Sequence, residues 1–164
     1  MRKVAIITSS DTGYRGERTD ESGPVIKSIV EGAGYEVVHY VILPDEKEML
    51  AAEMARIADE KIAQLIITTG GTGFSPRDVM PEATKSITER EVPGIPEAMR
   101  AFSMRYTKRT MLSRAAAGIR KSTLIINLPG SPKACRENLE YIIEELEHGL
   151  GILLEEEKNC AVKD

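Results

Sequence analysis

Three short runs of β-branched and apolar residues constrain the fold of this chain more than any other feature. Residues 3–9, 63–69 and 123–128 lack the alternation that a half-exposed strand shows. Such runs are typical of strands buried on both faces, as in parallel sheets covered by helices. Segments with helical spacing separate the runs. We therefore predict an α/β fold of three layers, with a largely parallel central sheet and helices on both faces.

The remaining elements follow from helical periodicity and from turn residues. We expect a helix from residue 21 to Gly34, a strand over 36–43, a helix opening at Pro44-Asp45, helices near 81–89 and 95–106, and a long final helix after Pro132. Residues 155–164 are expected to be a charged, frayed end. Because no repeat or linker interrupts the pattern, residues 1–164 are predicted to form a single domain.

Composition excludes several classes of function. The net charge is −4, whereas a nucleic-acid-binding protein normally carries a basic surplus, so we expect no nucleic-acid partner. No apolar run approaches the ~20 residues that span a bilayer, and the opening run is too short for a secretory signal. Cys135 and Cys160 form no metal-binding pattern. We therefore predict a cytoplasmic location and no membrane contact.

Polar and glycine-rich loops follow four of the predicted strands. They are residues 9–13, residues 44–46, residues 70–78 and residues 129–132. In parallel sheets, ligands bind beyond the carboxyl ends of the strands, where these loops would meet. Hydroxyl groups, carboxylates and exposed backbone amides would then converge on one crevice. This combination indicates a site for phosphate groups and a metal ion.

The run Gly70-Gly71-Thr72-Gly73 is the most conspicuous of these loops. Glycine adopts positive φ and lets the backbone approach a ligand, so that successive N–H groups can face an anion. The run is neither a P-loop nor a dinucleotide-binding fingerprint. A tight strand-to-helix turn is the alternative. If the run binds a ligand, Gly71→Val is expected to weaken binding and leave the fold largely intact.

Asp45 and Asp78 are the candidate acidic residues. Mg²⁺ in proteins commonly takes one or two carboxylates and completes its shell with water and phosphate oxygens, so this pair would suffice. Each aspartate also has a plainer interpretation. Asp45 precedes a helix, with Glu48 three residues on, as in a capping box. Asp78 stands just before another predicted helix and is a plausible N-cap.

Five linked segments resemble the MogA/MoaB-like molybdopterin-binding proteins of molybdenum cofactor biosynthesis. They are TGGTG at 69–73 with RDVMPEAT at 77–84, PGIPEAMR at 93–100, MLSRAAAG at 111–118, INLPGSPK at 126–133, and PDE at 44–46. They occur in order over nearly the whole chain. Residues 112–120 and 127–132 are more similar to the molybdopterin adenylyltransferases and the gephyrin G domain than to the MoaB branch.

This resemblance implies an activity and a set of site residues. The family's adenylyltransferases move AMP from ATP to the terminal phosphate of molybdopterin with Mg²⁺ and release pyrophosphate. Asp45 and Asp78 correspond to the catalytic, metal-binding pair. The expected substrate and nucleotide contacts come from the strand-end loops and the similar segments: Ser10, Asp11, Gly70, Gly71, Thr72, Gly73, Ser113, Asn127, Gly130 and Ser131. A homotrimer and a handover to a molybdenum-insertion protein are also implied.

Two alternatives remain open at this point. The first is a MoaB-like pterin-binding protein without adenylyltransferase activity. The second is an unrelated nucleotide-binding regulator of flavodoxin-like design. Formation of an adenylylated product from ATP would exclude the first, and binding of a pterin would exclude the second.

Overall fold

The apolar runs form the central strands of one sheet. In the computed structural model, which describes residues 1–156, these strands are β1 (Lys3–Ser9), β3 (Leu65–Thr69) and β6 (Thr123–Leu128). Every residue of β3 and β6 is buried. With β2 (Glu36–Leu43) they pair in parallel, in the order β2-β1-β3-β6. The predicted α/β fold with a largely parallel sheet is confirmed.

Two antiparallel strands complete the sheet, and the sequence did not predict them. They are β5 (Ala117–Arg120) and β4 (Arg90–Glu91), which extend the order beyond β6. The turn between β5 and β6 consists of Lys121 and Ser122, with Lys121 at a φ of 51°. Hairpins are recognised in a sequence by Asn-Gly or Asp-Gly turns and by β-branched strands. This hairpin has no such turn, and its first strand begins with alanine and glycine.

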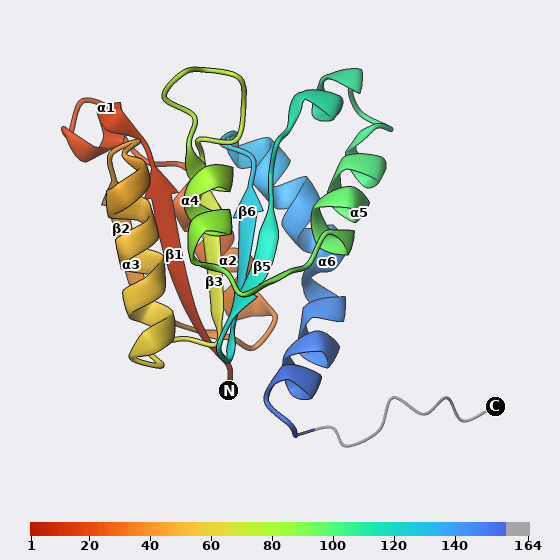
Figure 1. Cartoon of the computed structure of the whole chain (residues 1–164). Helices are drawn as coiled ribbons and strands as arrows, with labels where there is room; N and C mark the ends of the chain where they lie inside the picture. The colour runs from red at the N-terminus through yellow and green to blue at the C-terminus, as the bar shows by residue number, and fades with distance from the viewer. Residues whose placement is uncertain (157–164) are drawn as a thin grey trace.

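Helices cover both faces of the sheet (Figure 1). One face packs against α3 (Lys47–Asp59) and α4 (Met80–Ile87), and the other against α2 (Ser22–Gly32), α5 (Gly94–Ser103) and α6 (Pro132–Leu153). All five were predicted, with ends that differ by up to three residues. The short helices α1 (Asp11–Tyr14) and η1 (Lys108–Leu112) were not. In the described part of the chain, no helix is long and apolar enough to cross a membrane.

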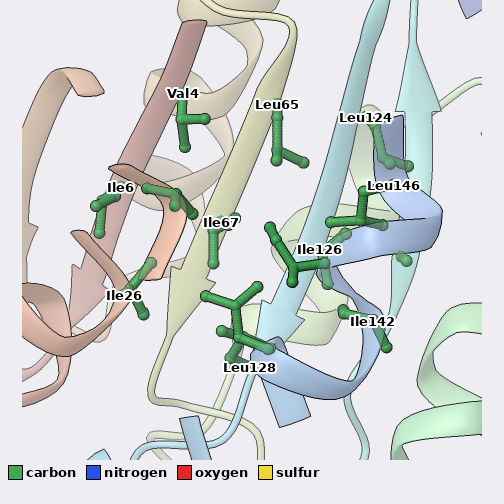
Figure 2. Packing of buried hydrophobic residues seen from close by; sticks show 14 of the residues in the cluster. Val4, Ile6, Ile26, Leu65, Ile67, Leu124, Ile126, Leu128, Ile142 and Leu146 are labelled. Carbon is green, nitrogen blue, oxygen red and sulfur yellow. The ribbon is translucent and has the colours of Figure 1, made fainter. Parts of the chain in front are cut away.

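Successive residues of the central strands face opposite layers. In β1, Val4 and Ile6 belong to the core beneath α2 and α6, whereas Ala5 and Ile7 belong to the core beneath α3 and α4. Figure 2 shows the first of these cores, in which Ile26 of α2 packs against the same face of the sheet. Burying one isoleucine side chain contributes roughly 1.5–3 kcal/mol. Both helical layers are therefore anchored by the same strands.

The parallel strands place four loops at one end of the molecule. In Figure 1, α1, the loop after β3 and the beginning of α6 all lie at the upper end of the sheet. The loops that the sequence singled out after β1, β2, β3 and β6 therefore share the carboxyl edge, as expected. Residues 157–164, which hold Cys160 and most of the predicted frayed end, lie outside the described residues.

Candidate active site

A crevice of about 330 Å³ lies between the carboxyl ends of β1, β3 and β6. Four of the predicted residues line it: Ser10, Gly70, Gly130 and Ser131. A Cβ built on Gly130 would lie 3.5 Å from the Cα of Gly70, so two of the strand-end loops meet backbone to backbone. The crevice thus joins parts of the chain that are far apart in sequence.

Ser10 and Ser131, which line the crevice, also cap helices. Ser131 Oγ accepts from the N–H of Ala134 at 3.1 Å, at the beginning of α6, and Ser10 Oγ accepts from the N–H of Gly13 at 3.0 Å, in α1. Such contacts satisfy backbone donors that have no partner within the helix. Each hydroxyl is therefore held in a fixed position at the crevice wall.

Gly70 and Gly71 both adopt positive φ, at 89° and 67°. A Cβ on Gly70 would lie 2.4 Å from the carbonyl oxygen of Ser9. A Cβ on Gly71 would meet only ordinary contacts, at 3.4 Å and beyond. Its φ is nevertheless one that β-branched residues rarely adopt. The expectation that Gly71→Val spares the fold is therefore wrong, because valine at this position strains the backbone whether or not the loop binds a ligand.

The carboxylate of Asp45 points towards the loop after β1. Its Oδ1 accepts from the hydroxyl of Ser9 at 2.5 Å, and its Oδ2 accepts from the N–H of Asp11 at 3.0 Å. The N-cap of α3 is Glu46, and its side chain makes no capping hydrogen bond. The capping-box interpretation of Asp45 is therefore wrong. Since Ser9 also lines the crevice, Asp45 is one hydrogen bond away from the crevice wall.

Asp78 lies in the loop after β3 and does not cap α4 either. Its Oδ2 accepts from the N–H of Ser75 at 3.0 Å. Helix α4 begins at Met80, and its N-cap, Val79, makes no side-chain capping bond. A Cβ on Gly73 would lie 2.8 Å from Asp78 Oδ2, so the last glycine of the run packs directly against this carboxylate.

Two arginines hold the loop that carries Asp78. Arg114 donates to the carbonyl oxygens of Gly73 and Asp78, at 2.7 Å each, and also pairs with Glu82. Arg77 donates to both carboxylate oxygens of Asp11 at 3.0 Å. The hydrogen bonds from Arg77, with that from the Asp45 backbone, hold the pKa of Asp11 below its ordinary value.

Ser113 and Asn127 lie outside the lining of the crevice. The Asn127 side chain is fully buried: its Oδ1 accepts from the N–H of Ala116 at 3.1 Å, and its Nδ2 donates to Thr68 and Thr84. Ser113 Oγ accepts from the N–H of Ala115 at 3.3 Å. Both residues therefore hold the segment before β5, which contacts the glycine loop where the N–H of Arg114 donates to the carbonyl of Thr72.

Asp20 also lines the crevice, and the sequence did not single it out. Its carboxylate accepts from the hydroxyl groups of Thr8 and Tyr40 and from the N–H groups of Ser22 and Gly23. Partial burial raises the pKa of Asp20, but these hydrogen bonds outweigh it and leave the pKa below its ordinary value. The signal was present, since aspartate just before a helix is a capping pattern.

The fold and the site define a class of protein. A parallel α/β domain with glycine and acidic loops at the carboxyl edge of its sheet has the arrangement of proteins that bind phosphate-bearing ligands. Over residues 5–148 the chain matches the family described as a probable molybdopterin binding domain, and it belongs to this MogA/MoaB-like family of molybdenum cofactor biosynthesis. Membership of this family excludes the alternative that the chain is an unrelated nucleotide-binding regulator of flavodoxin-like design.

Individual relatives cover most of the chain. The molybdopterin adenylyltransferase of Helicobacter pylori strain J99 is 37% identical over 153 residues, which span 92% of this chain and 87% of that protein. Gephyrin of Dictyostelium discoideum is 42% identical over 160 residues, which span 92% of this chain but 22% of gephyrin. The molybdopterin biosynthesis enzyme MoaB of Thermus thermophilus superposes with a TM-score of 0.88 at 46% identity, over 93% of this chain and 96% of that one.

Proposed function

We propose that this chain transfers an adenylyl group from ATP to the terminal phosphate of molybdopterin. An oxygen of that phosphate attacks the α-phosphorus of ATP. The bond from this phosphorus to the bridging oxygen breaks, and its electron pair leaves with pyrophosphate. The observation that carries the proposal is that Asp45 and the glycine-lined crevice are joined through Ser9, in a family with a relative named for this reaction.

The charges at the carboxyl edge favour a metal ion in this reaction. Arg77 pairs with Asp11 and Glu46, and Asp45 is bonded to Asp11, so these three carboxylates leave the cluster net negative. Two phosphate-bearing substrates would be repelled there without a cation. Within residues 1–156, no group of three or more His, Cys, Asp and Glu side chains is arranged to hold a metal. We propose that Asp45 and Asp78 each supply one carboxylate to a Mg²⁺ ion whose shell the substrate phosphates complete, where the ion would neutralise phosphate charge.

The remaining site residues bind and orient the substrates in this proposal. Backbone amides of residues 70–73, together with that of Gly130, hold phosphate oxygens in this proposal, and the positive φ of Gly70 and Gly71 helps to turn the amides towards them. Ser10, Asp11 and Ser131 line or support the crevice wall. Asn127 acts from within the core, by fixing the segment that carries Ser113. None of these roles needs a proton transfer, because the attacking phosphate is already anionic.

Incubation with molybdopterin, ATP and Mg²⁺ tests the proposal directly. We expect adenylylated molybdopterin and pyrophosphate to form in equal amounts. The competing candidate is a MoaB-like protein that binds the pterin without transferring AMP, which the 46% identity to a MoaB structure favours. Binding of molybdopterin without ATP-dependent product would establish that candidate instead.

Gly73→Ala provides a test of Asp78 that changes no charge. The φ of Gly73 lies outside the positive region, so alanine does not strain the backbone there. Its Cβ would lie 2.8 Å from Asp78 Oδ2 and must displace that carboxylate. We expect adenylylation to fall about tenfold with little change in melting temperature, since misplacement of a reacting group by ~1 Å can cost more than this. The control is Gly32→Ala, where the added Cβ meets nothing within 4 Å. Equal rates in both variants would contradict the prediction.

We also propose that the chain forms a homotrimer, as its resemblance to the adenylyltransferases implies. An apolar hollow of about 480 Å³ between α5, α6 and β5 offers a surface for a second copy. Ile95 and Ala98 of α5 line this hollow. Light scattering at micromolar concentration is expected to give three times the mass of the chain. A stable monomer would contradict this.

The setting of the reaction follows from the same family. We propose that the protein acts in the cytoplasm and hands its product to a molybdenum-insertion protein. The adenylylated product remains in the open crevice at the edge of the sheet, where a partner could receive it. The test is to form labelled product on the protein and to add an excess of unlabelled product to the solvent. A direct handover predicts that the insertion protein still receives the labelled product undiluted.

A further inference from the structure

The guanidinium of Arg77 joins three loops at the carboxyl edge. Its Nε and Nη2 atoms donate to the two carboxylate oxygens of Asp11 at 3.0 Å, and Nη2 also donates to Oε1 of Glu46 at 2.9 Å. Asp11 follows β1, Glu46 follows β2, and Arg77 lies in the loop after β3. A two-point contact fixes the orientation of the guanidinium plane as well as its distance.

Asp11 in turn holds the loop that carries Asp45. The backbone N–H of each residue donates to the carboxylate of the other, at 3.0 Å in both directions. The Oδ1 atom of Asp11 accepts both from the backbone of Asp45 and from Arg77. The positions of Asp45 and Arg77 are therefore coupled through a single carboxylate.

We propose that Arg77 and Asp11 are positioning residues that set the placement of Asp78 relative to Asp45. This inference rests on the proposed function, in which the two aspartates act on the same phosphate groups. Asp78 follows Arg77 in the chain, and Asp45 precedes Glu46, so the Arg77 contacts tie one aspartate loop to the other. Arg114 fastens the Asp78 loop independently. Loss of Arg77 therefore frees the loops from each other without unfolding either.

A direct contact between Arg77 and a substrate phosphate is the competing role. In the structure, Nε and Nη2 of Arg77 are already engaged by two carboxylates, which would have to release the guanidinium. The two roles differ in their kinetics. A phosphate contact acts through Arg77 alone, whereas a positioning pair fails equally when either member is lost.

A double-mutant cycle separates these roles. The variants are Arg77→Ala, Asp11→Asn and the two combined, because asparagine keeps an oxygen for the Asp45 N–H and loses the charge. We expect each single variant to lower kcat roughly ten- to a hundredfold, with a higher half-saturating Mg²⁺ concentration and an unchanged Kd for molybdopterin. The double variant should be no slower than the slower single variant. Arg77→Lys should recover part of the loss.

The chain offers a matched control on α3. Arg56 makes the same two-point contact with Glu53, at 3.0 and 2.8 Å, and a further contact with Glu60. Arg56→Ala, Glu53→Gln and their combination are expected to show wild-type kinetics. Thermal melts of all variants should show folded protein with similar melting temperatures.

Several results would overturn the inference. If the kcat losses of the two single variants multiply in the double variant, Arg77 and Asp11 act independently. A higher KM for ATP at unchanged kcat would show that Arg77 contacts a phosphate. Wild-type kinetics in the Arg77 and Asp11 variants, combined with a loss in Asp78→Asn, would remove this inference and leave the proposed function standing. Absence of product with the wild-type protein would remove the proposed function and this inference with it.

Discussion

Asp78→Asn is expected to lower the rate of adenylylation by about 10² to 10³, with normal folding and normal binding of molybdopterin. Metal stabilisation of phosphate charge contributes several kcal/mol to a transition state, and each ~1.4 kcal/mol is a factor of ten in rate. Asparagine nearly preserves the size of the side chain and keeps an oxygen for the N–H of Ser75, which is the hydrogen bond that Asp78 makes in the structure. The change therefore removes the charge and little else.

Asp45→Asn is expected to have a smaller effect on rate and a larger one on stability. Both oxygens of Asp45 accept hydrogen bonds, from Ser9 and from the N–H of Asp11, and asparagine can accept only one of them. The loss of one such bond costs about 1 kcal/mol. Asp78 packs against Gly73, the last glycine of the run proposed to hold phosphate oxygens, so we expect its variant to lose more of the rate.

Initial rates at several Mg²⁺ concentrations, with a thermal melt of each variant, provide the measurement. Raised Mg²⁺ should restore part of the rate if the loss lies in affinity for the metal. Product formation at the wild-type rate by both variants would remove the two-aspartate site and favour the binding protein. A capping role predicts that same result, and the structure already excludes capping by either side chain.

Gly70→Ala is expected to destabilise the fold by about 3 kcal/mol. Its φ of 89° strains an alanine, and the added Cβ would lie 2.4 Å from the carbonyl oxygen of Ser9, which is backbone and cannot turn aside. Backbone strain contributes roughly 1–3 kcal/mol, and overpacking adds a similar amount. For a domain of this size, this corresponds to a melting temperature lower by about 6–12 °C.

Thermal melts of Gly70→Ala and Gly149→Ala test this expectation. A Cβ on Gly149 meets nothing within 4 Å, and the residue lies inside α6, where alanine is favoured over glycine. The Gly149 variant should therefore melt at or slightly above the wild-type temperature. Equal melting temperatures for the two variants would show that the turn at Gly70 relaxes at no cost.

The parts of the fold that the sequence predicted are those fixed by local pattern. Strands β1, β3 and β6 are buried on both faces, so their composition alone identified them. Once the strands were known to be parallel, geometry placed their loops at one edge. The convergence of Ser10, Gly70, Gly130 and Ser131 on one crevice followed from that geometry.

The parts that the sequence missed depend on contacts between distant segments. Helical spacing after Asp45 favoured a cap, because nothing local indicates that its carboxylate turns to residues 34 and 36 positions earlier. The pairing of Arg77 with Asp11 spans 66 positions and has no local signature either. Strand β5 was missed because it begins with alanine and glycine. Asn127 was expected at the ligand, but its side chain accepts from the N–H of Ala116, just before β5.

The composition of the crevice wall has a consequence for how the protein responds to its ligands. Residues 8–10, 69–70 and 130–131 meet there only after the first and last thirds of the chain have docked on the same sheet. The unfolded chain has no such surface, so a ligand held by this wall binds the native state alone. At a hundred times its Kd, such a ligand contributes about 2.7 kcal/mol to the free energy of unfolding. A saturating supply of a ligand that binds this wall therefore raises the resistance of the protein to heat and proteases.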